Sequence, residues 1–341
     1  MNSATKLCQL AECQVASTGK CHLGHDPVER CPNYGHDKAA ADESDVPVDI
    51  GAEKPEPVEI CSGDVMHLDD LESFVRAKTV RTVALIGEHR AGKTTLLASI
   101  YAMYCKGHFA GMSFVGSRTL VGFAKVHHLA LLNSGRTDPT TPRTSRDDPV
   151  AFFHLALARG RRDVVDLIVS DRSGEAYGAA RIDTDLIQKL PELQQADRAC
   201  FLLDGAKLAS KEQRPAYARQ FKQMIHALHD NGALANAKAV EVLATKFDLT
   251  KTRGNTEDQI KFLDAYERQI SAEFKEHGLD IACYRVCALP KSDASVGFVG
   301  LDDMIERWTA VLPMPSLAPA PIGAAPRQID RLLAKATGGL A

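Results

Sequence analysis

The sequence predicts an α/β fold in which a mostly parallel sheet lies between two layers of helices. Apolar strands and amphipathic helices alternate from residue 80 to residue 312. A glycine-rich segment directly follows the first of these strands, and short polar motifs follow two later strands. Because the ligands of parallel sheets bind beyond the carboxyl ends of the strands, we expect these motifs to meet at one edge of the sheet.

Composition excludes several classes of function. The chain has 341 residues, enough for one large domain or two modest ones, with 45% hydrophobic and 25% charged residues. A formal net charge of −3 provides no global attraction to nucleic acid or acidic lipid, so no nucleic-acid partner is expected. There is no apolar run of membrane-spanning length and no apolar core of a secretory signal, which predicts a cytoplasmic protein without an integral membrane segment.

Residues 1–37 are rich in Cys and His, and we expect them to form a zinc module. Their spacing is C-x4-C-x7-C-x3-H-x5-C. In a reducing compartment such a cluster favours metal over disulfides, and four-ligand Zn²⁺ supplies folding energy that so small a segment cannot obtain from a core. The favoured ligands are Cys8, Cys13 and Cys31, with Cys21 and His25 competing for the fourth position. The alternative is a flexible tail with free thiols.

Residues 38–60 have the composition of a solvated linker. From position 37 to position 59 the chain carries eight Asp and Glu residues against two lysines, and three prolines interrupt it. An acidic interaction tail is the alternative. Residues 61–79 then contain a short amphipathic helix, expected over 65–78, with Leu68, Leu71, Phe74 and Val75 on one face.

The rest of the chain divides into an α/β domain, residues 80–313, and a Pro/Ala-rich tail, residues 314–341. Strands are expected where apolar and β-branched residues form short runs, and helices where apolar residues recur every three or four positions. Expected strands cover 82–86, 151–158, 164–169, 199–203, 240–244 and 282–288, with a short strand or loop at 111–117. Expected helices cover 95–104, 118–132, 210–230, 256–273 and 301–312, with a long polar loop at 133–149 and a short helix at 328–336.

The segment that follows the first strand matches the phosphate-binding pattern G-x-x-x-x-G-K-T and predicts a P-loop NTPase fold, a three-layer α/β/α sandwich. Glycine lets the backbone wrap closely around an anion, and the following helix presents its positive end to the phosphates. Lys93 reaches the β- and γ-phosphates, and the Thr94 hydroxyl can ligate Mg²⁺. The expected nucleotide contacts here are Gly87, Glu88, His89, Arg90, Ala91, Gly92, Lys93, Thr94 and Thr95.

Asp171 and Gly174 match the pattern D-x-x-G at the end of another expected strand. The carboxylate can hold Mg²⁺ through water and the Gly174 amide can donate to a γ-phosphate, so we expect a switch segment that is ordered only while this phosphate is present. Glu175 comes next in the sequence. A carboxylate at this position can orient the attacking water but repels the γ-phosphate, and the alternative is that Glu175 simply faces solvent.

The segment Thr245-Lys246-Phe247-Asp248 matches the guanine-reading pattern N/T-K-x-D. The Asp248 carboxylate can accept hydrogen bonds from guanine N1 and N2, a donor pair that adenine lacks, and the Lys246 stem can pack along the base. Ala288, after the last strand, can offer its amide to guanine O6. These residues therefore predict GTP rather than ATP, although an ATPase with an accidental T-K-F-D is the alternative.

A threonine that ligates Mg²⁺ from a first switch segment is expected among Thr137, Thr140, Thr141 and Thr144. Thr144 is favoured because it lies nearest the following strand and beside Arg143. Arg143 can act as an arginine finger within the same chain, and a solvated loop arginine is an equal alternative.

The motif order resembles the translation-factor class of P-loop GTPases. Finer features resemble the second type of the bacterial double-GTPase family, and the resemblance covers residues 80–312. These features are F-x-G-S-x-T-L-x-G-F at 114–123, the Thr- and Pro-rich loop that ends in Arg143-Thr144, His154, and S-D-x-S-G-E at 170–175. The family name reflects frequent tandem domains, whereas this chain has one P-loop, so any partner GTPase would be a separate polypeptide.

The resemblance implies a GTPase in a bacterial multi-protein signalling or conflict system, with a protein effector of unknown identity. Together with the motifs it predicts a Mg²⁺-dependent switch in which Lys93, Asp171, Gly174, Glu175 and Arg143 serve hydrolysis of GTP to GDP and phosphate. The alternative is a nucleotide-gated scaffold that binds GTP, hydrolyses little of it, and docks through the zinc module.

Overall fold

A seven-stranded sheet organises the larger of the chain's two structural units, Ile60–Ala341; the smaller unit is Met1–Glu59. The computed structural model describes residue 8 and residues 13–35, 61–130, 149–160, 163–248, 256–288 and 298–312. The helix expected at 328–336 and nearly all of the polar loop expected at 133–149 lie outside these residues.

The strand order is β2-β3-β4-β1-β5-β6-β7. The parallel strands are β1 (Val80–Ile86), β4 (Asp163–Asp171), β5 (Arg198–Asp204), β6 (Ala239–Thr245) and β7 (Ile281–Arg285). The antiparallel strands at one edge are β3 (Ala151–Arg159), which pairs with β4, and β2 (Ser113–Gly116), which pairs with β3. This mostly parallel sheet confirms the predicted α/β fold.

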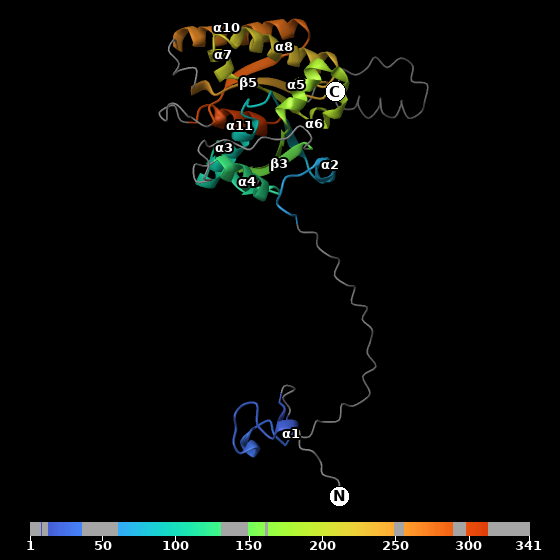
Figure 1. Cartoon of the computed structure of the whole chain (residues 1–341), viewed down its shortest axis with the longest axis vertical. Coiled ribbons are helices and arrows are strands. Elements are labelled where there is room, and N and C mark those ends of the chain that lie inside the picture. Colours follow the sequence, from blue (N-terminus) through green and yellow to red (C-terminus); the bar gives the residue numbers. More distant parts are fainter. Residues whose placement is uncertain are drawn as a thin grey trace, which may run out of the picture. The chain divides into compact units, whose positions relative to one another are not determined.

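Helices cover both faces of the sheet (Figure 1). One face carries α5 (Gly174–Ile182), α8 (Arg214–Asp230) and α10 (Thr256–Glu276). The opposite face carries α3 (Lys93–Lys106), α4 (Leu120–Ala130) and α11 (Leu301–Thr309). Each face has its own buried core, centred on residues such as Phe201 and Phe221 on the first and Leu97 and Trp308 on the second.

Residues 61–79 pack on the sheet rather than standing apart from it. Met66 pairs with Phe152 through two backbone hydrogen bonds of 3.0 and 2.9 Å, and α2 (Leu68–Ala77) buries Leu71 and Phe74 against β3 and β4. The helix begins at Leu68, later than the expected residue 65, because the preceding residues are extended to make this pairing. The His67 amide donates to the Asp70 carboxylate (2.9 Å) and closes the first turn.

Four short helices were not expected from the sequence: α5, the 3₁₀ helix η3 (Thr184–Lys189), α6 (Pro191–Gln194) and α7 (Gly205–Ala209). Their sequences have little helical apolar periodicity because they bury only one to three side chains each. The last strand also ends sooner than expected, at Arg285 rather than residue 288. Cys287 leaves the ladder and pairs with Val299 instead.

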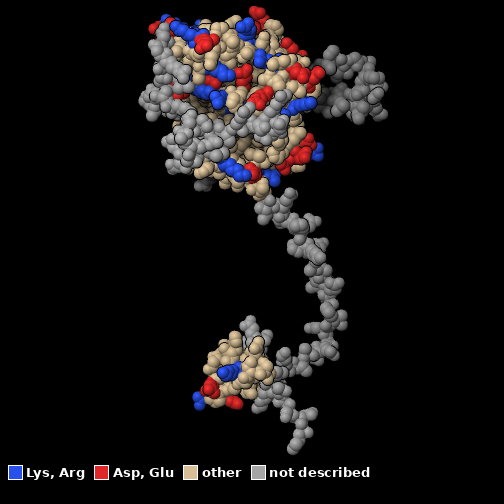
Figure 2. All heavy atoms as spheres, viewed as in Figure 1, with Lys and Arg blue, Asp and Glu red and all other residues tan. Residues whose placement is uncertain are grey.

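The smaller unit contains the short helices α1 (Val15–Thr18) and η1 (Val28–Arg30), and Cys8 pairs with Tyr34. Among the described residues, no helix is long and apolar enough to cross a bilayer. On the face shown in Figure 2, basic and acidic side chains are interspersed, without a large area of one sign.

Candidate functional site

The candidate site lies at the carboxyl edge of the four central parallel strands. β1 is followed by Gly87, and the strands β4, β5 and β6 end at Asp171, Asp204 and Thr245. β4 and β5 both flank β1, and Asp204 lies opposite Thr245 in the ladder between β5 and β6. The sheet therefore brings together motifs that lie up to 158 positions apart, from Gly87 to Thr245, as the topology predicted.

The backbone of the phosphate loop is tightly wound. Arg90 and Gly92 have φ angles of 65° and 101°, in the left-handed region that glycine tolerates best. A side chain at Gly87 would place its Cβ 3.2 Å from the Cβ atoms of Ala91 and Leu202, so the loop and β5 approach each other closely there. α3 starts at Lys93, directly after this turn, and points its N-terminus into the loop.

The Lys93 side chain lies across the loop. Its ammonium donates to the carbonyl of Gly87 at 2.8 Å and to that of Glu88 at 3.4 Å. Burial lowers the pKa of Lys93, while the negative charges of Asp171 and Glu88 oppose this shift. The Lys93 ammonium is therefore buried inside the loop. An anionic ligand bound there would stabilise its positive charge, which burial disfavours.

Thr94 and Asp171 form the part of the site that fits a divalent cation. The Thr94 hydroxyl donates to Asp171 Oδ2 at 2.7 Å, whereas Asp171 Oδ1 is buried without a hydrogen-bond partner. Burial raises the pKa of Asp171, and the Lys93 ammonium and the Thr94 hydroxyl oppose this shift. An orphaned carboxylate oxygen beside a hydroxyl is an all-oxygen donor set, which suits Mg²⁺.

The D-x-x-G segment lies directly against the phosphate loop. A Cβ on Gly174 would stand 2.2 Å from both the carbonyl carbon of Glu88 and the amide nitrogen of His89, so only glycine fits this position. Ser173 caps α5 by accepting a hydrogen bond from the Glu175 amide. Glycine at this position thus brings two backbone segments of the site into contact.

Protein contacts hold this segment in addition to the expected γ-phosphate contact. Tyr177 of α5 is fully buried, and its hydroxyl donates to Glu192 at 3.0 Å. Arg172, inside the D-x-x-G motif, donates to the other oxygen of Glu192 at 3.1 Å. The sequence predicted a segment ordered by phosphate alone; its docking also depends on this buried carboxylate, because Tyr177 and Arg172 would lose their partner without it.

The T-K-F-D segment, which is predicted to read guanine, is bonded to the phosphate loop. The Thr245 hydroxyl donates to the Ala91 carbonyl at 2.8 Å. The Lys246 ammonium donates to the Arg90 carbonyl at 2.6 Å and to the Asp204 carboxylate at 2.7 Å. These bonds connect the T-K-F-D segment directly to the phosphate loop.

Asp248 is buried, and the Cys287 thiol donates to its Oδ1 at 3.5 Å. Ala288, the next residue after Cys287, is held by α3, because its carbonyl accepts a hydrogen bond of 2.9 Å from the Ser99 hydroxyl. The structure thus brings Asp248 and Ala288 to the same end of the site. The sequence suggested Ala288 only through its position after a strand.

Two site residues were not anticipated from the sequence. Asp204 holds Lys246, and Lys207 on α7 pairs with Glu88 of the phosphate loop at 3.0 Å. Asp204 is the last residue of β5 and Lys207 follows three positions later; no sequence motif accompanies either of them. Pairing over 119 positions, from Glu88 to Lys207, is set by the sheet order and leaves no local pattern.

Some predicted site residues are placed less tightly. His89 and Arg90 are exposed at the mouth of the loop, and Glu175 and Thr95 are partly buried. The candidates of the first switch lie outside the described residues: Thr137, Thr140, Thr141, Arg143 and Thr144.

The cysteines of the smaller unit interact with one another through two thiol contacts, and the charge of Cys13 also acts on Cys21. The Cys13 thiol interacts with that of Cys8, and the Cys21 thiol with that of Cys31. Backbone amides lower the pKa of the Cys13 and Cys21 thiols. The His22 amide has the largest effect on Cys13, and the His25 amide has the largest effect on Cys21. In the described part of the chain, however, no three Cys, His, Asp or Glu side chains form a group that could hold a metal ion. The four-ligand zinc site is therefore not shown.

The sequence model of the family described as Double-GTPase 2 matches residues 81–309. No curated protein matches the chain. A solved structure of the signal recognition particle receptor SRb-GTP/SRX complex from Chaetomium thermophilum is 18% identical, over 68% of this chain and 97% of that chain, with a TM-score of 0.36. A mutation variant of SsGBP is 12% identical, over 71% of this chain and 61% of that chain, with a TM-score of 0.33.

Replacing Gly174 by Ala tests the contact between the D-x-x-G segment and the phosphate loop. The added methyl group would lie 2.2 Å from backbone atoms, so the segment must shift. We expect the free energy of unfolding, measured in urea, to fall by about 1–3 kcal/mol. Gly178→Ala in the same helix is the matched control, since nothing lies within 4 Å of its Cβ position. That change should be neutral or stabilising by up to about 1 kcal/mol. Equal effects of the two substitutions would contradict the close contact.

Proposed function

The chain belongs to the Double-GTPase 2 family and is a P-loop protein that binds GTP, and we propose that it works as a Mg²⁺-dependent switch that hydrolyses GTP to GDP and phosphate. One observation carries the proposal. Thr245 and Lys246 of the base motif bond directly to the Ala91 and Arg90 carbonyls of the phosphate loop. These bonds support a site in which Asp248 reads the base while the phosphate loop holds the triphosphate.

Binding combines two kinds of recognition. The phosphate loop recognises the triphosphate through its wound backbone, the N-terminus of α3 and Lys93, none of which distinguishes one base from another. The carboxylate of Asp248 accepts hydrogen bonds from guanine N1–H and N2–H. The Cys287 thiol helps to fix the orientation of this carboxylate by donating a hydrogen bond to Oδ1. The Lys246 side chain, held by Asp204, lies where its alkyl stem can pack along the base plane.

Hydrolysis needs a cation, a water and charge stabilisation. Thr94 and, directly or through water, Asp171 would hold Mg²⁺, which would neutralise charge that develops on the β- and γ-phosphates. Gly174 brings its backbone against the loop beside His89, where its amide can donate to the γ-phosphate. We assign Glu175 to orienting the attacking water and Thr144 to binding the cation. Arg143 would stabilise charge in the transition state only if its loop inserts it as an arginine finger. Water adds to the γ-phosphorus as the bond to the β–γ bridging oxygen breaks, and the water's proton leaves to phosphate or solvent.

The family context supports a role among several proteins. We propose that GTP-dependent ordering of the two switch segments is read by a protein effector in a bacterial multi-protein signalling or conflict system. Residues 1–37 would dock that effector as a zinc module joined by the acidic linker at 38–60 to the helix-containing segment 61–79 and the GTPase domain at 80–313, with the tail at 314–341. The paired thiols of the smaller unit support metal binding there, since amides that lower thiol pKa values also favour the thiolate that Zn²⁺ requires.

GTP should be preferred over ATP through Asp248. Two charge-assisted hydrogen bonds worth about 1.5–3 kcal/mol each imply discrimination of roughly a hundredfold or more. Asp248→Ala should weaken GTP binding strongly and leave weak ATP binding nearly unchanged, whereas Lys93→Ala should weaken both. Competition against a fluorescent GTP analogue measures this. If ATP competes as well as GTP for the wild-type protein, the base motif is accidental, and only nucleotide binding by the P-loop survives.

Intrinsic hydrolysis should be slow. A carboxylate at Glu175 is a poor neighbour for the γ-phosphate, and GTPases that lack an inserted arginine turn over at roughly 10⁻⁴ to 10⁻³ per second. Phosphate release in single-turnover experiments measures the rate, and Asp171→Ala should reduce both the rate and Mg²⁺-dependent binding. A rate near one per second would instead point to Arg143 as a built-in arginine finger. No release above the uncatalysed background would favour the nucleotide-gated scaffold.

The smaller unit should bind one Zn²⁺. Metal analysis of protein purified without chelator should find about one zinc per chain, as four-ligand structural sites do. Binding of GTP should survive deletion of residues 1–37, because no phosphate or base contact lies there. Protein that contains no zinc would show that the thiol pairs act otherwise.

A further inference from the structure

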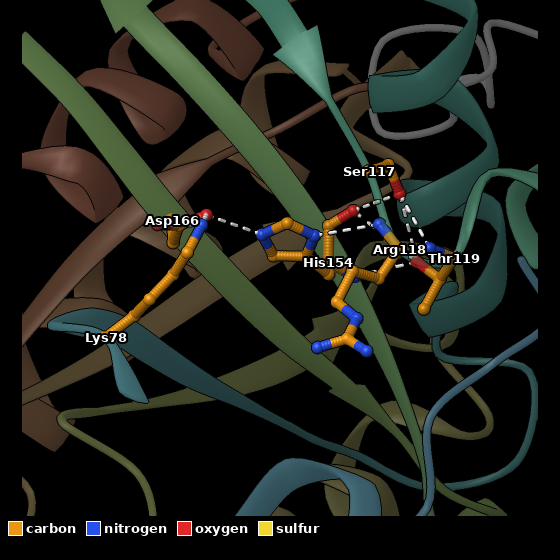
Figure 3. Close-up of polar contacts among 6 residues, drawn as sticks. All are labelled: Lys78, Ser117, Arg118, Thr119, His154 and Asp166. Carbon is orange, nitrogen blue, oxygen red and sulfur yellow. Dashed lines mark hydrogen bonds and ion pairs between the residues drawn. The ribbon is translucent and has the colours of Figure 1, made fainter. Parts of the chain in front are cut away.

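A buried histidine outside the nucleotide site holds the turn that begins α4 (Figure 3). Three polar groups of His154, on β3, bind the three residues of this turn. The Ser117 hydroxyl donates to the His154 carbonyl at 2.5 Å, and the His154 amide donates to the Thr119 hydroxyl at 2.8 Å. The Arg118 amide donates to His154 Nδ1 at 3.0 Å. One residue thus fixes the whole turn.

These contacts continue the sheet where its edge strand stops. The ladder between β2 and β3 ends with Gly116 opposite Ala156, so the next outward-facing backbone groups of β3, those of His154, have no strand to pair with. The hydroxyls of Ser117 and Thr119 take that place. This arrangement gives a physical reason for the S-x-T spacing at 117–119, which the nucleotide site itself does not use.

The tautomer of His154 is set from the opposite side. Because Nδ1 accepts the Arg118 amide, the ring proton is on Nε2, which donates to Asp166 Oδ1 at 2.8 Å. Asp166 in turn pairs with Lys78, which follows α2, at 3.3 Å. The ring is also packed edge-on against Phe74 at 4.8 Å between centroids. A chain of contacts from Lys78 therefore determines which nitrogen of His154 can accept the Arg118 amide.

Burial and two nearby cations favour the neutral form of His154, whereas Asp166 favours the charged form. Burial lowers the pKa of His154; Asp166 opposes this shift, and the positive charges of Lys78 and Arg118 add to it. Protonation would place a hydrogen on Nδ1, opposite the Arg118 amide, and would break that bond. The clamp on the turn is thus present at neutral pH and lost in acid.

The clamp joins elements that carry the nucleotide site. β3 pairs with β4 so that His154 lies opposite Ile168, and Ala151, three positions earlier, lies opposite Asp171. α4 packs on α3, the helix of Thr94, through the stacked rings of Phe123 and Tyr101, 5.7 Å apart. The two cation-binding residues of the site are therefore on the two elements that the clamped turn and β3 support.

We propose that His154 is a positioning residue for Mg²⁺-dependent nucleotide binding, which it serves by locking the start of α4 onto β3. This inference rests on the proposed function. It does not require His154 to touch nucleotide, cation or water. Its distinguishing feature is that only the acceptor at the Nδ1 position matters for the lock, whereas Asp166 and Lys78 act by keeping that acceptor available.

Two substitutions at His154 separate this role from simple packing. In His154→Asn the amide oxygen lies near the former Nδ1 position and can still accept the Arg118 amide, but the contact with Asp166 is lost. In His154→Gln the longer amide can reach Asp166, but no acceptor remains for Arg118. The measurement is the dissociation rate of a fluorescent GDP analogue with Mg²⁺ and with EDTA, for folded protein checked by circular dichroism.

We expect Asn to keep the ratio of the two rates within about twofold of wild type, and Gln to accelerate release about tenfold with Mg²⁺ but not with EDTA, in the range of couplings between linked sites. Unchanged ratios in both variants would overturn the inference while leaving the proposed function intact. If wild type binds no guanine nucleotide, the proposed function fails instead. Hydrogen exchange of the Arg118 amide, faster in Gln and not in Asn, then still tests the clamp, and equal exchange in the two variants would refute it.

Lys78→Gln provides a milder test at a half-exposed position that should not impair folding. Removing this charge should raise the pKa of His154, because Lys78 lowers it. For wild type, Mg²⁺-dependent retention should persist at pH 6.5 and fall only at more acidic pH; in Lys78→Gln the loss should begin at higher pH. His154→Asn, which has no group to protonate there, should keep this retention until the more acidic pH at which Asp171 itself protonates. A profile that is the same in all three proteins would refute the role of the imidazole.

Discussion

The site depends on how the carbonyls of the phosphate loop are satisfied. Four of them are bound by side chains: those of Gly87 and Glu88 by Lys93, that of Arg90 by Lys246, and that of Ala91 by Thr245. A loop that wraps an anion must turn carbonyl oxygens away from it, and buried carbonyls need donors. Here the donors come from the helix that follows the loop and from the end of β6. The same bonds therefore shape the cradle and attach it to the base motif.

The other buried carboxylates among the described residues have hydrogen-bond or ion-pair partners, which makes the exception at the site informative. Glu241 accepts from the Arg198 guanidinium and from the Trp308 indole at 3.3 Å, which fastens α11 to the sheet. Glu192 likewise has partners on both oxygens. Within the described residues, Asp171 Oδ1 is the one buried carboxylate oxygen without a hydrogen-bond partner. Buried carboxylates are usually paired because an unpaired buried charge costs several kcal/mol, and the unpaired oxygen of Asp171 is consistent with the proposed cation.

How much could be read from the sequence depended on whether a feature is local. The P-loop, D-x-x-G and T-K-F-D each lie within a few residues of a strand end, so their type and placement followed from pattern and from the parallel topology. The pairs Glu88–Lys207 and His154–Asp166 could not be predicted, because they depend on the strand order and on the register between β3 and β4. α5 was missed for a different reason: its small residues bury only Gly174, Tyr177 and Ala180, which leaves little periodic signal. Motifs that lie within a short stretch of sequence could be predicted, whereas the side chains that support them from distant positions could be identified only from the folded structure.

The short strand β2 has a consequence for handling the protein. It lies at the end of the sheet and covers β3, a strand of nine residues that would otherwise offer its backbone to other chains. Uncovered strands of that length template aggregation. β2 itself is only four residues long and exposes Phe114 and Val115, so few backbone hydrogen bonds hold it over β3. Substitutions confined to β2, which leave the turn at 117–119 intact, should therefore reduce solubility before they affect nucleotide binding.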